Sequence, residues 1–146
     1  MSYTTSALIM FMAGLGVPIL ATLNASLGSF IGSPVAAVTV LLGIAFASIL
    51  LIFFITSPVS LSRLTEVPRH LFLAGLFMVF YILSITSIAP VFGVGNAIFF
   101  VLLGQLISAG LIDHFGVFGA TISPLTLTRS LGIALMGLGV WVTQQV

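Results

Sequence analysis

The chain has 146 residues, of which 60% are hydrophobic, 3% are charged and none is cysteine. Because an average soluble domain carries about 25% charged residues, a soluble protein could not cover its surface with so few. The composition therefore excludes a soluble, a disulfide-bonded secreted, a disordered and a nucleic-acid-binding protein, and it predicts a protein that lies in a lipid bilayer.

Five apolar stretches predict five membrane spans, each of about the 20 residues that a bilayer requires. They run continuously, without the alternation of a barrel strand, so they predict helices, in which every backbone group pairs within its own segment. We therefore expect an all-α membrane protein, a single five-helix transmembrane domain over residues 1–146. In chain order the spans lie near residues 5–27, 34–56, 70–87, 94–112 and 124–143.

Helix start and stop signals separate these spans. Ser33-Pro34 and Ser123-Pro124 each pair a capping residue with a proline suited to the first helical position, and they predict the starts of the second and fifth spans. Between the third and fourth spans, Pro90 followed by two glycines predicts a tight reversal.

The arginines predict an orientation. Arg63 and Arg69 lie in or beside the linker after the second span, and Arg129 lies about one turn into the fifth span, close enough to reach back to the same side. All Lys and Arg residues then share one face, which by the positive-inside rule places the N-terminus in the cytoplasm.

The first span contains the strongest local anomaly. Gly14, Gly16 and Pro18 lie near its middle, and Pro18 removes a backbone donor there. Asn24 shares one helical face with several small residues. One interpretation is a close packing face for neighbouring helices; the other is a discontinuous helix that lines a substrate cavity. The two interpretations are compatible.

Further polar side chains offer candidate binding groups. Gln105 lies deep in the fourth span, where a buried amide needs a partner or a ligand, whereas Asn96 lies near its start and points nearly the opposite way. In the third span Tyr81 shares a face with Ser84 and Ser87, although such hydroxyls often bond to their own helix.

Asp113 and His114 mark the end of the fourth span. A carboxylate beside an imidazole suits proton handling or gating. The simpler alternative is a solvated helix end, or an ion pair between Asp113 and one of the three arginines.

No Asp, Glu, Lys or Arg lies in the interior of any predicted span. Charged-substrate sites and proton relays usually contain such residues, so the pattern favours a neutral or weakly polar solute. No catalytic triad, phosphate loop or metal-ligand cluster is present in the sequence, and we expect neither an enzyme nor a cofactor or metal.

The chain resembles the YdcZ-type family, short five-helix bacterial inner-membrane proteins of the drug/metabolite transporter superfamily. The resemblance covers nearly the whole sequence and depends on a set of glycine- and proline-containing motifs. These are Gly14-x-Gly16-x-Pro18, Asn24-x-x-Leu27-Gly28, Gly32-Ser33-Pro34, Gly104-Gln105-Leu106, Asp113-His114-Phe115-Gly116-x-Phe118-Gly119, Leu131-Gly132 and Gly137-x-Gly139.

The resemblance implies half of a ten-helix transporter with inverted repeats. We therefore expect a multi-pass inner-membrane exporter of a small organic solute that acts as an antiparallel homodimer, or as a heterodimer with a homologous chain, by alternating access. In this hypothesis Asn24, Gln105, Tyr81, Pro18, Gly14 and Gly16 form the substrate site, and Asp113 and His114 lie at its inner mouth. The alternatives are a non-transporting subunit of a larger membrane complex and a lipid flippase.

Overall fold

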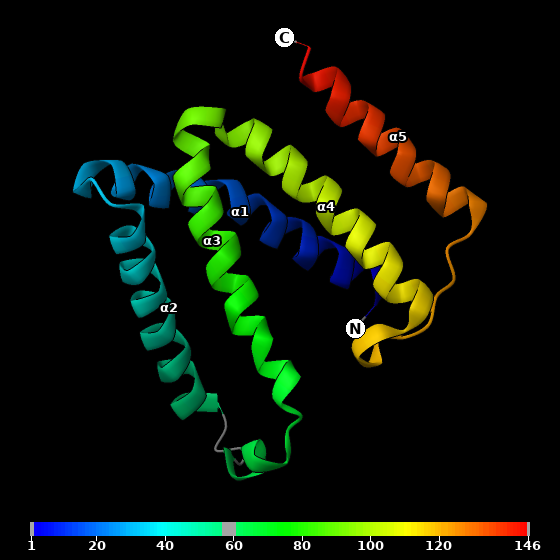
Figure 1. The fold of residues 1–146 in the computed structure, drawn as a ribbon. Coiled ribbons are helices and arrows are strands. Elements are labelled where there is room, and N and C mark those ends of the chain that lie inside the picture. The colour runs from blue at the N-terminus through cyan, green and yellow to red at the C-terminus, as the bar shows by residue number, and fades with distance from the viewer. Residues whose placement is uncertain (1, 57–60, 146) are drawn as a thin grey trace. The chain divides into compact units, whose positions relative to one another are not determined.

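The computed structural model describes residues 2–56 and 61–145, and all of its regular elements are helices. They form two units, Met1–Val94 and Gly95–Val146, which we describe separately. Figure 1 labels the five α-helices. Their bounds are α1 Tyr3–Ile31, α2 Pro34–Thr56, α3 Leu73–Phe92, α4 Val94–Phe115 and α5 Leu127–Thr143, with short 3-10 turns at Leu61–Glu66, Arg69–Phe72 and Val117–Gly119.

The prediction of an all-α membrane protein with five helices is confirmed. Within the described residues, α1, α2, α4 and the stretch Arg69–Phe92 are long and apolar enough to cross a bilayer. The fifth helix has 17 residues, or about 25 Å, somewhat less than the ~30 Å of the hydrocarbon core.

The first unit is a three-helix cluster in which α1 packs against both α2 and α3 (Figure 1). On α1 the buried residues are Ala21, Asn24, Ala25 and Gly28, and three of these four are small, which lets the helix backbones approach closely. A methyl group at Gly28 would lie 3.4 Å from Pro34 Cα, 3.4 Å from Thr86 Cγ2 and 3.6 Å from Ala37 Cβ. Gly28 is therefore the point where the three helices converge.

We expect Gly28→Leu to disrupt this cluster, because a large side chain would have to displace the backbone at Pro34 as well as the side chain of Thr86. Gly28→Ala should be tolerated, since its contacts stay at ordinary van der Waals distance. In detergent, the midpoint temperature of thermal unfolding should fall clearly for Gly28→Leu and change little for Gly28→Ala. Equal stability of the two variants would contradict this packing.

The second span begins as expected. Gly32 ends α1 in the left-handed conformation at φ 76°. Ser33 then caps α2, since its hydroxyl accepts from the backbone N–H of Ala36 at 3.2 Å and Pro34 is the first helical residue.

The third span extends further than predicted. Helix α3 continues to Phe92 instead of ending near Ser87, and Pro90 lies inside its last turn. Only the donor of one helix hydrogen bond is lost there, so the helix continues until Gly93 at φ 90°. Gly93 is the single residue between α3 and α4.

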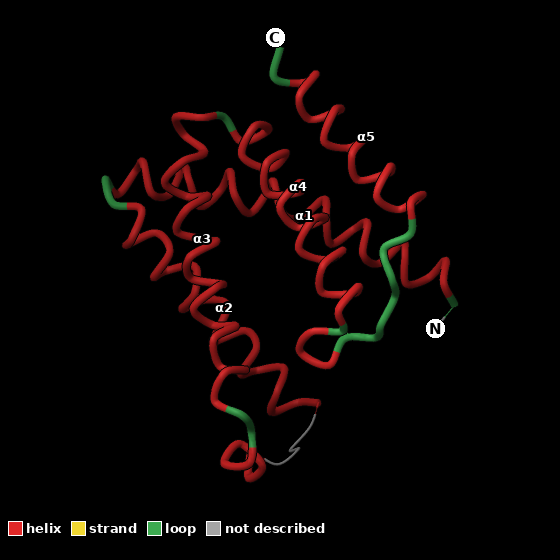
Figure 2. Tube along the Cα trace, turned by 45° about the vertical axis from the view of Figure 1, so that its right-hand side comes forward, coloured by secondary structure: helices red, strands yellow, loops and turns green. Residues whose placement is uncertain are grey.

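The start of the fifth helix was also predicted wrongly. Residues 120–126 are non-helical, and α5 begins at Leu127, capped by the hydroxyl of Thr126, which accepts from the Arg129 N–H at 3.2 Å. Figure 2 shows this connection between α4 and α5 as a long loop. Ser123 does not cap the helix, because it lies three residues before the cap Thr126, in the non-helical segment. Its backbone N–H donates to the carbonyl of Asp113 at 2.8 Å, and its hydroxyl accepts from the guanidinium of Arg129 at 3.5 Å.

Candidate functional site

Asn24 is a buried interhelical contact within the first unit. Its side chain is 3% exposed, and its Nδ2 donates to Oγ1 of Thr86 on α3 at 2.6 Å. Ala21, Ala25 and Gly28 on the same part of α1 are also buried. This geometry confirms the packing interpretation of this helical face.

The sequence analysis did not identify Thr86, although it considered Tyr81, Ser84 and Ser87 on the same helix. It is only 1% exposed and lies on the buried face of α3 with Ile82 and Ala89. The spacing of these three residues, four and then three apart, is that of one helical face. That pattern was the signal that could have identified the partner of Asn24.

The interpretation of the first span as a discontinuous helix around Pro18 is wrong, because α1 is one continuous α-helix from Tyr3 to Ile31. Pro18 cannot donate to the carbonyl of Gly14, so one helix hydrogen bond is missing. The helix nevertheless continues through Pro18. One turn further on, the hydroxyl of Thr22 donates to the carbonyl of Pro18 at 2.8 Å. A methyl group at Gly14 or Gly16 would meet nothing within 4 Å, so no neighbouring element requires a glycine there.

The other two predicted binding groups lie in different units. Tyr81 is half-buried in α3, and Gln105 is exposed on α4. Contact of either residue with a substrate stays a prediction.

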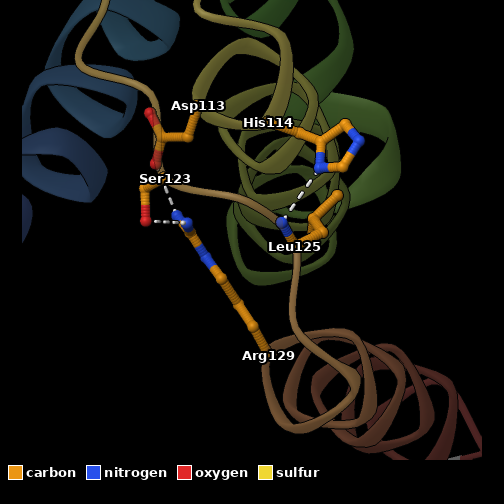
Figure 3. Close-up of polar contacts among 5 residues, drawn as sticks. All are labelled: Asp113, His114, Ser123, Leu125 and Arg129. Atoms are coloured by element: carbon orange, nitrogen blue, oxygen red, sulfur yellow. Dashed lines mark hydrogen bonds and ion pairs between the residues drawn. The ribbon is translucent and has the colours of Figure 1, made fainter.

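Asp113 forms the ion pair that was considered as an alternative to gating, and its partner is Arg129. The Arg129 guanidinium donates to Oδ2 of Asp113 at 2.6 Å, with side chains 37% and 34% exposed respectively (Figure 3). The same guanidinium reaches Oγ of Ser123 at 3.5 Å. The ion pair joins the end of α4 to the first turn of α5.

His114 holds the same loop through its ring. Its Nδ1 accepts from the backbone N–H of Leu125 at 3.0 Å, as Figure 3 shows. A ring nitrogen accepts only when it carries no proton, so this contact requires neutral imidazole. Asp113 and His114 therefore bind successive parts of one loop and position α5.

Close turns in the loop make this arrangement possible. Gly116 and Gly119 have φ values of 61° and 81°, and Phe118 has φ 59°, a conformation that is uncommon outside glycine. A methyl group at Gly116 would lie 2.7 Å from Cγ1 of Ile122, so glycine fits both the backbone and the space.

The opposite end of α5 is fastened as well. Nε2 of Gln144 donates to Oδ1 of Asn96 at 3.0 Å, which gives Asn96 a partner that the sequence did not reveal. Between the two polar ends, an apolar groove of about 290 Å³ separates α4 from α5, lined by residues such as Phe99, Leu103 and Met136. Polar contacts at its ends and apolar side chains between them thus define the α4–α5 hairpin.

The polar contacts described above hold helices and a loop together. Within residues 2–56 and 61–145, no group of three or more His, Cys, Asp or Glu side chains lies close enough to hold a metal ion.

Comparison with known proteins gives one match. A family model with the description "Putative inner membrane exporter, YdcZ" matches residues 5–142. No curated protein and no solved structure matches.

Proposed function

The chain belongs to the YdcZ family of inner membrane exporters, and from that premise we propose that it exports a small neutral or weakly polar organic solute. The match across residues 5–142 is the observation that carries this proposal. It supports a multi-pass inner-membrane transport protein rather than an enzyme.

The distribution of charge supports a neutral solute. Residues 1–62 contain no Asp, Glu, Lys or Arg, and the carboxylate of Asp113 lies at a helix end, paired with Arg129. Intramembrane charges usually mark proton relays and sites for charged substrates. Amides, hydroxyls and aromatic rings would therefore recognise the solute.

We assign direct solute contacts to Gln105 and Tyr81. Gln105 is an exposed amide in the middle of an apolar helix, where an unpaired polar group is costly unless water, a ligand or another chain meets it. Asn24 is buried and its amide donates one hydrogen bond to Thr86, so its contribution would be to hold α1 and α3 in place around the pathway. Asp113 and His114 would lie at the inner mouth, with N-terminus in the cytoplasm.

We further propose that two chains act together by alternating access. The resemblance to the drug/metabolite transporter superfamily favours ten helices in two inverted repeats, and an oppositely inserted second chain would supply the missing five. That second chain would be an identical copy or a homologue. The exposed faces of α2, on which Ile44, Phe46 and Phe54 lie, offer apolar surface for lipid or for such a partner.

Export is tested by overproducing the chain in a bacterium and profiling the solutes of the medium by mass spectrometry. We expect one chemical group of uncharged solutes to accumulate outside cells that carry the protein. Gln105→Ala should reduce the initial rate of accumulation roughly tenfold, the effect of losing one hydrogen bond to a buried ligand.

Ser48→Ala is the matched control, because Ser48 is exposed on α2 and its hydroxyl donates only to the carbonyl of Ile44 in its own helix. This variant should export at the normal rate. An unchanged medium despite normal amounts of protein in the membrane would contradict export. Accumulation of charged solutes would contradict the neutral substrate class.

A further inference from the structure

A groove of about 450 Å³ lies in the first unit, between the last turns of α1 and the end of α3. This volume is within the range of small-molecule sites, about 300–1,000 Å³. One wall carries three hydroxyl groups and the other is apolar, and no charged residue contributes to either. The main lining residues are Thr22, Ser26, Ser29, Phe30, Pro90 and Val94.

Two of the three hydroxyls in this groove, those of Ser26 and Ser29, differ from the others in the same three helices, whereas Thr22 donates to the carbonyl of Pro18 at 2.8 Å. Thr39 and Ser87 donate to the carbonyl four residues earlier, at 2.9 and 2.8 Å, as serine and threonine commonly do in membrane helices. The side-chain hydroxyls of Ser26 and Ser29 form no hydrogen bond with any residue in the described part of the chain. Two hydroxyls on neighbouring turns of α1 therefore have free hydrogen-bonding capacity.

The opposite wall is apolar. It is formed by Ala89, Pro90 and Val94. A ligand here would find donors and acceptors close to apolar surface.

The groove lies near one end of the unit. With 29 residues α1 is about 43 Å long, more than the ~30 Å hydrocarbon core, so its last turns extend toward the membrane interface. Helix α2 separates this end from the linker that contains Arg63 and Arg69. If the arginines face the cytoplasm, the groove opens to the outer face.

We propose that, in the chain whose N-terminus is cytoplasmic, this groove is the outer vestibule of the export pathway and binds uncharged amphipathic solutes. Their hydroxyl or amide groups would pair with Ser26 and Ser29, and their apolar part with Phe30 and Pro90. This inference rests on the proposed export function. It adds a place where the solute leaves the protein and the chemical features that the solute must have.

Single cysteines test the proposal, because the chain contains none. The purified full chain in lipid nanodiscs would carry Ser26→Cys or Ser29→Cys and react with a charged, membrane-impermeant methanethiosulfonate. The depth-matched control is Thr39→Cys, since Ser26 and Thr39 each lie about one and a half turns from the loop between α1 and α2. Thr39 is exposed and bonded only within α2.

We expect Ser26→Cys to react about tenfold faster than Thr39→Cys, because a thiol ionises in a hydrated groove and stays protonated against lipid. Phenylethanediol at twice its dissociation constant should slow the reaction about threefold. Phenylethylammonium and phenylacetate, which have the same ring and opposite charges, should give little protection.

Equal rates for Ser26→Cys and Thr39→Cys would overturn the proposal, as would equal protection by all three probes. Reaction only with a lipophilic reagent would mean that lipid fills the groove, and a disulfide between two Ser26→Cys chains would mean that a second copy covers it. Either result would also refute the vestibule. The labelling requires no transport, so its failure and a failure of export in cells are separate results.

Discussion

Replacing Asn24 by alanine should lower the free energy of unfolding by about 1–2 kcal/mol, the largest single effect that we expect from a polar side chain in the first unit. The substitution removes the donor to Thr86 and leaves a small void where α1 meets α3. Unfolding of the purified protein in mixed detergent micelles would measure the loss.

A double-mutant cycle with Thr86→Val isolates the contact. We expect a coupling energy between about 0.6 and 1.7 kcal/mol, which are the average and the maximum that double-mutant cycles gave for interhelical hydrogen bonds in one membrane protein. Thr22→Ala is the control on α1, because its hydroxyl bonds only to Pro18 in the same helix. Loss of export by Asn24→Ala with unchanged stability and no coupling would instead assign Asn24 to the solute site.

Replacing Arg129 by glutamine should release the loop between α4 and α5. The ion pair is about one-third exposed, so its loss should cost about 1 kcal/mol or less of global stability. The local effect should be larger, since the guanidinium contacts both Asp113 and Ser123 at the start of α5. Protease cleavage within residues 116–126 would therefore increase well before the protein unfolds.

Arg69→Gln removes the same charge from an exposed position outside the loop, and we expect normal cleavage for that variant. Exchange of the two charges, Asp113→Arg with Arg129→Asp, should restore part of the protection. Equal cleavage in Arg129→Gln and Arg69→Gln would show that the ion pair does not position α5.

The sequence predicted helices well where local signals decide them. The second span was correct at both ends, because Ser33-Pro34 caps it and an uninterrupted apolar run ends at Thr56. Errors arose where two local signals compete. Pro90 was interpreted as a helix breaker although the last turn of α3 accommodates it, and Ser123-Pro124 was preferred to Thr126 as the start of α5.

Contacts between distant residues could not be predicted in the same way. Thr86 lies 62 residues from Asn24, and only the packing of α1 on α3 makes it the partner. Similarly, one side chain of the Asp-His pair binds an arginine on the next helix and the other binds the backbone at Leu125. Residue types identified both positions as special, whereas tertiary structure determines what each side chain bonds.

The two units of the proposed transporter are held together by different kinds of contact. In the first unit, Asn24 and Gly28 hold three helices together beside a groove with free hydroxyls. In the second, polar contacts at Asp113 and Asn96 fasten both ends of α5 to α4. Helix contacts next to apolar or hydroxyl-lined grooves suit a protein that binds a solute.

The central proposal is that a second, oppositely inserted chain completes the transport pathway. It is tested most directly by chemically crosslinking the chain in native membranes and labelling Ser2→Cys and Gln144→Cys variants of the crosslinked pair with an impermeant maleimide from outside. We predict pairs of five-helix chains in which one N-terminal and one C-terminal position face outward. Pairs with both Gln144 positions outside, or an uncrosslinked single chain, would contradict it.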